Sequence, residues 1–197
     1  MKSNAKLVCI IGRTCSGKDS LAHAISLHTG IDIIVSYTTR PKRDYEEDGK
    51  QHFFITEEEY EKDYAKKDKL AYTEINGYKY FTLFDQVANS KTGEMLYIID
   101  PVGYYELVSR YRYKIDIKSV YVECPREIRE ERYNKREDSV SVPFETRDKA
   151  ENEQFAEFEE VDKNQCDVII NTGNIDIFRF VYPVKDTNYN ASDTVDQ

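Results

Sequence analysis

The chain has little of what membrane, secreted and nucleic-acid-binding proteins depend on. No apolar run approaches the roughly 18 residues of a membrane span, and the charged start leads into an apolar strand rather than a signal peptide. Lysine and arginine number 28 against 37 aspartates and glutamates, and the net charge of −9 argues against a nucleic-acid partner. The four cysteines form no Cys-x-x-Cys pair, which predicts free thiols in a reducing compartment. We therefore expect a cytoplasmic protein with neither a membrane nor a nucleic-acid partner.

The length of 197 residues fits one α/β domain, or one with a small insertion. A domain of this size buries enough surface to fold without a disulfide or a structural metal. We expect a monomer or a homodimer whose partners are small molecules.

The segment from Gly12 to Ser20 carries more information than any other part of the chain. It follows the apolar run Lys6–Ile11 and precedes a helical pattern, Leu21–Leu27, that stops at Gly30. A strand, a glycine turn and a helix that opens at a lysine form the context of a phosphate-binding P-loop, in which backbone N–H groups and the helix N-terminus attract a polyphosphate. The residues predicted to bind ATP are Gly12, Arg13, Thr14, Cys15, Ser16, Gly17, Lys18, Asp19 and Ser20.

A tight surface turn without a ligand is the alternative for this segment, because glycine turns are common. The flanking strand and helix favour phosphate binding. The position after Lys18, where a P-loop has a Ser or Thr hydroxyl for magnesium, is occupied by Asp19.

Apolar runs alternate with helical stretches along most of the chain. Thr56 begins a capping box with Glu59, and Pro125 stands at the first position of another helical stretch. Strands are predicted at Lys6–Ile11, Ile31–Val35, His52–Ile55, Met95–Ile99, Ser119–Glu123 and Asp167–Ile170. This alternation predicts an α/β fold of the P-loop NTPase kind, with a mostly parallel sheet and helices on both faces. The stretch from about 40 to 84 is rich in tyrosine and phenylalanine and predicts a small β-rich insertion beside the main sheet.

A second cluster, from Ser36 to Arg43, suggests the class of substrate. It places the guanidinium groups of Arg40 and Arg43 three residues apart beside several hydroxyls. Guanidinium forks match phosphate oxygens in pairs, so the cluster suits a phosphate. A solvated basic loop is the alternative, and composition alone does not decide between the two.

Taken together, these segments resemble the guanylate kinase family over most of the chain. The P-loop is followed by SYTTRPKR, YEEDGKQHFF, NGYKYFT, IIDPVG, ECPREIREERYNKRE, ETRDKAENE and CDVIINT, which are similar to segments of the family in the same order. The resemblance implies transfer of the γ-phosphoryl group of ATP to GMP or dGMP, with magnesium as cofactor. It implies one domain over 1–182, with a core (1–35, 93–125 and 163–182), an acceptor-binding insertion (36–84) and a helical lid (126–150), before a disordered tail (183–197).

The resemblance also implies a role for each matching residue. Lys18 and the turn N–H groups would hold the ATP phosphates, while Arg132, Arg136 and Arg147 would close from the lid onto the transferring phosphoryl group. A salt-bridged helix face is the alternative for Arg132 and Arg136, because glutamates surround them. The residues implied to hold the acceptor nucleotide are Ser36, Arg40, Arg43, His52, Tyr80, Thr82 and Asp100.

Three positions depart from the family pattern. His52 stands where the family has a tyrosine on the acceptor phosphate, and Ala71 stands where it has a glutamate that pairs with guanine. Ile98 replaces the first aspartate at the end of a strand, and Glu74 is a candidate substitute for the missing glutamate. These departures leave the kinase class supported and the base of the acceptor open, so a kinase of another (deoxy)nucleoside monophosphate remains an alternative.

Asp19 is our candidate metal ligand. With Ile98 in place of a strand-end aspartate and Asp19 in the loop, we hypothesise that the carboxylate facing Mg²⁺ has moved from the strand to the loop. Two alternatives remain open: Asp19 caps the helix, or Ser20 supplies the hydroxyl one position late.

A different class of function is a catalytically inactive guanylate-kinase-like module that binds proteins. Such a module is expected to lose the P-loop lysine and the lid arginines. Gly17, Lys18, Arg136 and Arg147 are present in this sequence, so it favours an enzyme.

Overall fold

Five of the six predicted strands lie side by side in one parallel sheet. The computed structural model describes residues 5–44, 46–75, 77–88, 90, 93–135 and 142–172. The sheet has the order β2-β7-β1-β8-β9, and each neighbouring pair is parallel. Its strands are β1 (Lys6–Ile11), β2 (Asp32–Ile33), β7 (Glu94–Ile98), β8 (Asp116–Glu123) and β9 (Val168–Asn171). The predicted α/β fold with a mostly parallel sheet is confirmed.

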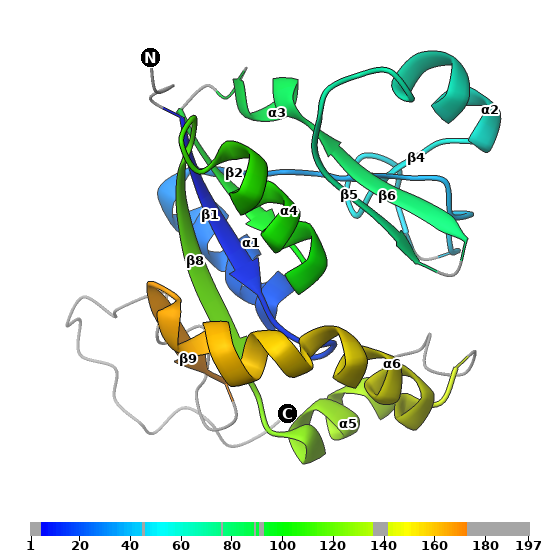
Figure 1. The fold of residues 1–197 in the computed structure, drawn as a ribbon. Coiled ribbons are helices and arrows are strands. Elements are labelled where there is room, and N and C mark those ends of the chain that lie inside the picture. Colours follow the sequence, from blue (N-terminus) through cyan, green and yellow to red (C-terminus); the bar gives the residue numbers. More distant parts are fainter. Residues whose placement is uncertain are drawn as a thin grey trace, which may run out of the picture.

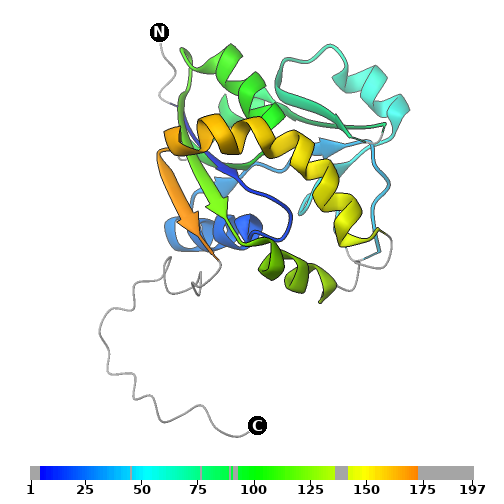
Figure 2. The ribbon, with the colours of Figure 1, turned by 60° about the horizontal axis from the view of Figure 1, so that its bottom comes forward.

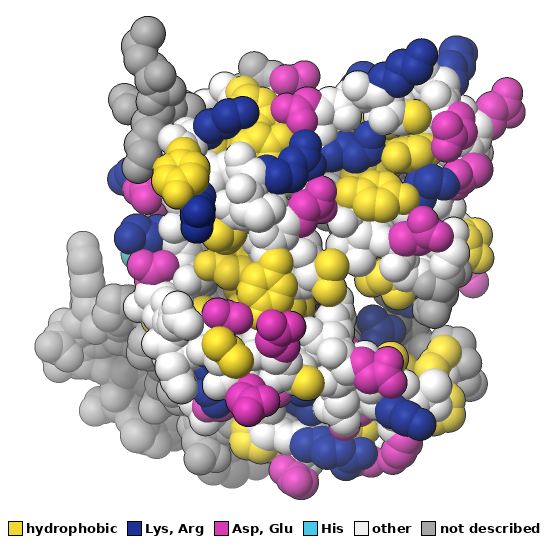
Figure 3. Space-filling model, viewed as in Figure 1, with side chains coloured by type: hydrophobic (Ala, Val, Ile, Leu, Met, Phe, Trp, Pro, Cys, Tyr) yellow, Lys and Arg dark blue, Asp and Glu magenta, His cyan; other side chains and the backbone are white. Residues whose placement is uncertain are grey.

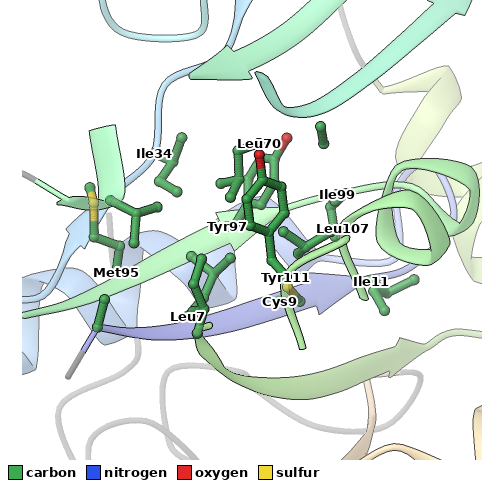
Figure 4. Packing of buried hydrophobic residues seen from close by; sticks show 14 of the residues in the cluster. Leu7, Cys9, Ile11, Ile34, Leu70, Met95, Tyr97, Ile99, Leu107 and Tyr111 are labelled. Atoms are coloured by element: carbon green, nitrogen blue, oxygen red, sulfur yellow. The ribbon is translucent and has the colours of Figure 1, made fainter. Parts of the chain in front are cut away.

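Helices cover both faces of this sheet, because side chains of β1 alternate between two apolar layers. Ile10 packs with Leu21 of α1 on one side, and Leu7 packs with Leu107 and Tyr111 of α4 on the other. Figure 4 shows this second layer between β1 and α4. Figure 1 shows α1 behind the sheet and α4 and α6 in front of it, and in Figure 2 α1 and α6 lie on opposite sides of the sheet. The helices are α1 (Lys18–Thr29), α3 (Phe84–Ala88), α4 (Pro101–Tyr111), α5 (Arg126–Asn134) and α6 (Phe144–Glu157).

The predicted β-rich insertion forms a second, four-stranded sheet at one side of the main sheet (Figure 1). Its order is β4-β3-β6-β5, in which β3 and β4 are parallel and the other pairs are antiparallel. Aromatic rings hold it together, as the Tyr37 ring stacks on Phe81 with centroids 5.2 Å apart. The strands are β3 (Tyr37–Thr38), β4 (Phe53–Phe54), β5 (Lys69–Ile75) and β6 (Tyr78–Leu83).

The capping box at Thr56 is confirmed. The Thr56 side chain accepts from the Glu59 N–H, and the Glu59 carboxylate accepts from the Thr56 N–H. The helix it opens, α2 (Glu57–Glu59), passes at once into a π-helix, η1 (Tyr60–Tyr64), which buries Tyr60 against Phe81. Pro125, predicted as the first helical residue, is instead the N-cap residue of α5, so the helix begins one residue later than predicted.

Helix α6 is the longest helical element and continues beyond its own end. It passes into a π-helix, η3 (Phe158–Asp162), and a 3₁₀ turn, η4 (Lys163–Gln165), that leads towards β9. Phe158 is fully buried and contacts the rings of Tyr104 and Tyr121. One end of this rod is therefore embedded in the core, while the other reaches towards α5 (Figure 2).

Some predictions concern residues outside the described ranges. Arg136, part of the predicted lid, and the predicted tail over 183–197 belong to this group. Within the described ranges, no helix combines the length and the apolar character that a membrane crossing requires. All four cysteines lie in the described ranges, and each is a thiol outside any disulfide, as predicted.

Candidate active site

The predicted P-loop is a sharply folded turn between β1 and α1. Cys15 and Gly17 both have left-handed backbone conformations, with φ of 61° and 96°, and Gly17 is the N-cap residue of α1. A side chain at Gly12 would place its Cβ 2.7 Å from the Ser16 Oγ and 2.8 Å from the Val122 carbonyl oxygen, so this position requires glycine. The loop thus directs backbone N–H groups and the positive end of α1 into one cradle.

Lys18 is the first residue of α1, as predicted. Its ammonium group lies 3.4 Å from the carboxylate of Asp19, which is more than half exposed. Gly17 is the N-cap residue of α1, so Asp19 does not occupy the capping position. Ser20 is exposed on the first turn of the same helix.

Arg13 is turned away from the cradle and fastens the loop to α6 and η3. Its guanidinium donates to both carboxylate oxygens of Glu159, each at 2.7 Å, and to the Asn152 side chain at 2.6 Å. It also lies over the Phe155 ring, 5.1 Å from the centroid. Only the backbone of Arg13 therefore faces the predicted phosphate site.

Helix α6 contacts the loop at Thr14. The Thr14 backbone N–H donates to both carboxylate oxygens of Glu151, each at 3.0 Å, and its hydroxyl donates to the same carboxylate. The Arg147 Nε donates to the Thr14 hydroxyl at 3.1 Å. Arg147 and Glu151 are four residues apart and so lie on one face of α6. The structure thus brings the predicted residue Arg147 to the loop, together with a glutamate that was not predicted.

Arg132 also contacts the loop, but from beneath it. Its guanidinium donates to the backbone carbonyls of Cys15 at 3.2 Å and Thr172 at 3.0 Å, with a longer contact to the Ser16 carbonyl at 3.4 Å. The alternative for Arg132 was a salt bridge with a glutamate of its own helix. The guanidinium contacts these backbone carbonyls instead. Its place is that of a positioning residue, which fixes the loop backbone.

A buried ionic cluster joins α5 and α6. Arg129 of α5 is 4% exposed and donates to the Asp148 carboxylate at 2.8 Å, while Arg126 donates to the same carboxylate at 3.0 Å. Burial alone would raise the pKa of Asp148, but these arginines hold it below its ordinary value. The second terminal nitrogen of Arg129, Nη1, lies 3.8 Å from the Glu151 carboxylate.

A cavity of ≈150 Å³ lies between the small sheet and the carboxyl end of β7. Four of the seven predicted acceptor residues line it: Ser36, His52, Tyr80 and Asp100. In Figure 3 the insertion and the lid helices are separated by a hollow at the right of the view, with basic side chains visible inside it. The described residues therefore place hydroxyl, imidazole and carboxylate groups around one cavity.

Arg40 and Arg43 are not among the residues that line this cavity, but Arg40 interacts with Tyr80, which does, and a buried glutamate holds it there. The Glu46 carboxylate, 5% exposed, accepts from both terminal nitrogens of Arg40, at 3.0 and 2.8 Å, and from the Arg43 backbone N–H at 2.9 Å. Although burial acts in the opposite direction, these contacts hold the pKa of Glu46 below its ordinary value. Glu46 therefore stays ionised and fixes the direction of Arg40.

His52 lines the cavity and lies close enough to Arg40 for the charge of Arg40 to act on its imidazole. Its Nδ1 lies 2.8 Å from the Ser36 hydroxyl, and its ring meets Tyr80 edge to face. Burial lowers the pKa of His52 below its ordinary value, and the charge of Arg40 lowers it further. The imidazole is consequently neutral at neutral pH in the free protein.

The lining of the cavity also includes Asp100 and several apolar side chains. Asp100 is the N-cap residue of α4, where it accepts from the Gly103 N–H at 2.9 Å, and its second oxygen lies 3.4 Å from the Thr73 hydroxyl. Thr82 does not line the cavity, because it is fully buried with its hydroxyl 2.8 Å from that of Tyr97. Ala71, Ile98 and Ile99 contribute apolar walls.

Glu74 is not among the residues that line this cavity. It pairs across the hairpin with Lys79 and accepts from the Tyr72 hydroxyl at 3.3 Å. Since side chains alternate along a strand, Glu74 shares a face with Tyr72, and Thr73 shares the opposite face with Tyr80. The candidate substitute for the missing glutamate therefore does not line this cavity.

Sequence reasoning missed the carboxylates that surround the predicted basic residues, namely Glu46, Asp148, Glu151 and Glu159. Their proximity in the sequence gave a partial signal, since Glu46 follows Arg43 by three residues and Glu151 follows Arg147 by four. That spacing indicates a neighbour on a helix, but not a contact with a loop more than a hundred residues away.

Comparison with known proteins agrees with the resemblance seen in the sequence. A family model described as guanylate kinase matches residues 4–177. The chain is 39% identical to the guanylate kinase of Thermotoga maritima over 84 residues, and 32% identical to that of Symbiobacterium thermophilum over 127 residues. These matches cover 42% and 63% of this chain, but only 40% and 59% of the relatives' own lengths.

A solved structure shares the fold. The crystal structure of guanylate kinase from Anaplasma phagocytophilum superimposes with a TM-score of 0.60 at 21% identity, over 91% of this chain and 82% of that one. At this level of identity the likeness establishes the architecture, and the chemistry has to be argued from the residues of this chain.

Proposed function

The chain belongs to the guanylate kinase family, and on that basis we propose that it transfers the γ-phosphoryl group of ATP to GMP, dGMP or a related (deoxy)nucleoside monophosphate. The observation that carries the proposal is the pairing of two anion sites. A P-loop with Lys18 at the start of α1 and Arg147 on its rim stands on one side. The cavity lined by Ser36, His52 and Tyr80 stands on the other.

Phosphoryl transfer requires little covalent chemistry from the protein. An acceptor phosphate oxygen attacks the γ-phosphorus while the bond to the β-γ bridging oxygen breaks, and catalysis consists of in-line positioning and of positive charge around the transferring group. On the donor side, the N–H groups of the loop and the Lys18 ammonium bind the ATP phosphates. Arg147, already in contact with Thr14, supplies charge at the γ-phosphoryl group.

On the acceptor side, Arg40 and Arg43 bind the monophosphate, with the Ser36 and Tyr80 hydroxyls completing the set. Glu46 keeps the Arg40 guanidinium in one orientation. The Arg40 side chain therefore loses less conformational entropy when the acceptor binds. The Tyr80 hydroxyl and the Arg40 guanidinium are close enough to interact in the free protein.

Recognition of the base falls to Asp100 and Thr73 in this proposal. With Ala71 in place of a glutamate and Glu74 outside the lining, Asp100 is the one carboxylate among the described residues that line the cavity. A site that leaves fewer polar groups to be satisfied discriminates less strongly between bases. We therefore expect activity on more than one base, or a preference other than GMP.

The residues of the loop fit a magnesium ion that is bound chiefly through nucleotide. Magnesium is commonly held by one or two carboxylates together with phosphate oxygens and water. The described residues contain no cluster of three or more potential protein ligands, but Asp19 offers one accessible carboxylate at the loop. Asp19 would hold the ion, which when bound neutralises charge on the phosphate oxygens.

A coupled phosphotransfer assay over the full panel of ribo- and deoxynucleoside monophosphates tests the proposal. We expect ATP- and magnesium-dependent turnover with at least one purine monophosphate. The absence of turnover with every acceptor, together with the absence of an ATP-induced rise in the melting temperature, would favour the inactive binding module instead.

A further inference from the structure

Glu151 occupies a place in the P-loop that suits an anion. Its carboxylate accepts from the Thr14 N–H with both oxygens at 3.0 Å and from the Thr14 hydroxyl. These donors lie in the loop that the proposed function assigns to the ATP phosphates. A carboxylate and a phosphate oxygen compete for the same N–H donors, since both are anionic acceptors.

Arg129 supplies the second half of the observation. It is 4% exposed, and within the described part of the chain its Nε and Nη1 make no hydrogen bond. Unsatisfied donors in a buried charged group are costly and call for an explanation. The Nη1 lies 3.8 Å from Glu151 Oε2, just outside hydrogen-bonding distance.

These two observations explain each other if the carboxylate has two positions. We propose that Glu151 sets the affinity of the donor-phosphate cradle by competing with phosphate for Thr14, and that Arg129 receives the Glu151 carboxylate when phosphate displaces it. The inference rests on the proposed function, because it assigns the competing anion as the polyphosphate of ATP.

The move requires only a side-chain rotation. Asp148 anchors Arg129 through its other terminal nitrogen at 2.8 Å, so the guanidinium stays in place while Glu151 turns towards it. The displaced carboxylate then gains a charge-assisted hydrogen bond and satisfies a buried donor. Arg147 keeps its position beside Thr14, so an arginine remains at the cradle after the glutamate has left it.

Binding of inorganic tripolyphosphate, measured by calorimetry without magnesium and without acceptor, isolates the cradle from the base and from Asp19. Glu151→Gln and Glu151→Ala are expected to bind tripolyphosphate about tenfold more tightly than wild type, because the competing charge is gone. ATP should follow the same order, and acceptor binding should not change. Glu153→Gln, which removes an equal charge from an exposed position two residues along α6, is the matched control and should bind like wild type.

A second set of variants tests the receiving role of Arg129. Replacing the buried pair together, Arg129→Leu with Asp148→Leu, keeps the site filled without leaving a lone charge. The displaced glutamate then has no partner, and tripolyphosphate binding should weaken about tenfold. Adding Glu151→Gln should restore it. Weakening that persists in the triple variant would overturn the receiving role, since Arg129 would then act on the phosphate directly.

The outcomes separate this inference from the proposed function. If Glu151→Gln binds tripolyphosphate no more tightly than wild type while wild type still transfers phosphate, the inference is wrong and the function stands. If wild type neither binds ATP nor transfers phosphate, the proposed function is wrong whatever the variants do. If the double leucine variant does not fold, the two Glu151 variants still decide whether the carboxylate competes.

Discussion

The proposed donor and acceptor halves of the site each hold a glutamate. One carboxylate contacts mainly a cationic side chain, and the other contacts neutral hydrogen-bond donors. In the acceptor half, Glu46 binds the Arg40 guanidinium, whose remaining surface can still meet a phosphate. In the donor half, Glu151 binds the N–H and hydroxyl of Thr14, which are donors that a phosphate needs. A carboxylate that orients a cation supports anion binding, whereas one that consumes donors opposes it. Removing the charge of each glutamate is therefore expected to have effects of opposite sign.

The largest effect is expected from removal of the Lys18 ammonium group in the donor half. Lys18→Ala should lower kcat at least about a hundredfold, because removal of a preorganised charge at the transferring group costs roughly 3 kcal/mol of transition-state stabilisation. Steady-state kinetics measures this loss, and the melting temperature without ligand should change little. Lys149→Ala, an exposed lysine on α6, is the matched control. Unchanged turnover in Lys18→Ala would remove the kinase assignment.

The next largest effect is expected from Glu46, whose charge should favour binding of the acceptor. Glu46→Gln should raise KM for the acceptor about tenfold or more, with KM for ATP unchanged, because Arg40 loses an ionic partner and its fixed direction. The neighbouring exposed Glu47→Gln provides a control of equal charge. An acceptor KM that falls in Glu46→Gln would show that Glu46 competes with phosphate as Glu151 is proposed to do, and the contrast between the two halves would disappear.

The base end of the acceptor half can be sharpened by restoring a carboxylate. Ala71→Glu places an acceptor on the wall of the cavity that also carries Thr73, and it should raise the preference for GMP over AMP about tenfold. The ratio of kcat/KM values for the two acceptors measures this preference. If wild type already rejects every base except guanine, then Asp100 with Thr73 is sufficient and Ala71→Glu should add nothing.

Asp19 tests whether the donor half uses a loop carboxylate for magnesium. Asp19→Ser and Asp19→Asn should both require several-fold more magnesium for half-maximal turnover, and Ile98→Asp in the Ser background should recover part of the loss. Titration of turnover with magnesium measures the effect. Unchanged magnesium dependence with a lowered melting temperature would mean that Asp19 serves only the first turn of α1.

The smallest expected effect is a change in thermal stability with pH, which should come from His52 in the acceptor half. The pKa of His52 is lowered in the folded protein, so just below its ordinary value of 6.5 the unfolded chain binds more protons than the folded one. The stability associated with His52 is therefore present above about pH 6.5 and is lost as the pH falls through that range. When the pH is lowered from 7.5 to 5.5, the Tm of the ligand-free wild type should fall by about 1–2 °C more than the Tm of His52→Gln.

The exposed His23→Gln of α1 is the control for this measurement and should behave like wild type. An acceptor monophosphate should reduce the loss, because its negative charge favours the protonated imidazole. A polyphosphate in the donor half should leave the His52 contribution unchanged. A pH response that is the same in His52→Gln and wild type would assign the titration to another group.

The sequence allowed the main sheet and the P-loop to be predicted, because each rests on a local pattern. The run Lys6–Ile11 is continuously apolar after its first residue, and the loop carries its glycines at fixed spacing. The capping box at Thr56 was equally local, yet it could not predict that α2 ends after three residues. That ending follows from Tyr60, whose ring is buried against Phe81 more than twenty residues away.

The arrangement of charges around the site lay beyond the sequence for a similar reason. Arg13 and Thr14 meet residues of α6 and η3 that are more than 130 positions distant, so no spacing rule connects them. Arg132 was placed near the loop by resemblance, but only the structure distinguishes a contact with backbone carbonyls from one with phosphate. Thr82 is likewise on a matching segment, and its hydroxyl is used by Tyr97.

The rod formed by α6 and η3 is anchored at one end, and we expect it to act as a lever. Phe158 is fully buried and Glu159 is tied to Arg13, so this end is the fulcrum, while Arg147 lies about 18 Å along the axis at 1.5 Å per residue. A tilt of about 10° at the fulcrum would carry Arg147 by ~3 Å and Glu151 by ~2 Å. Such small rotations break or restore contacts of hydrogen-bond length at Thr14. The core packing of one phenylalanine thereby limits how far the charged end of the helix can travel from the loop that it serves.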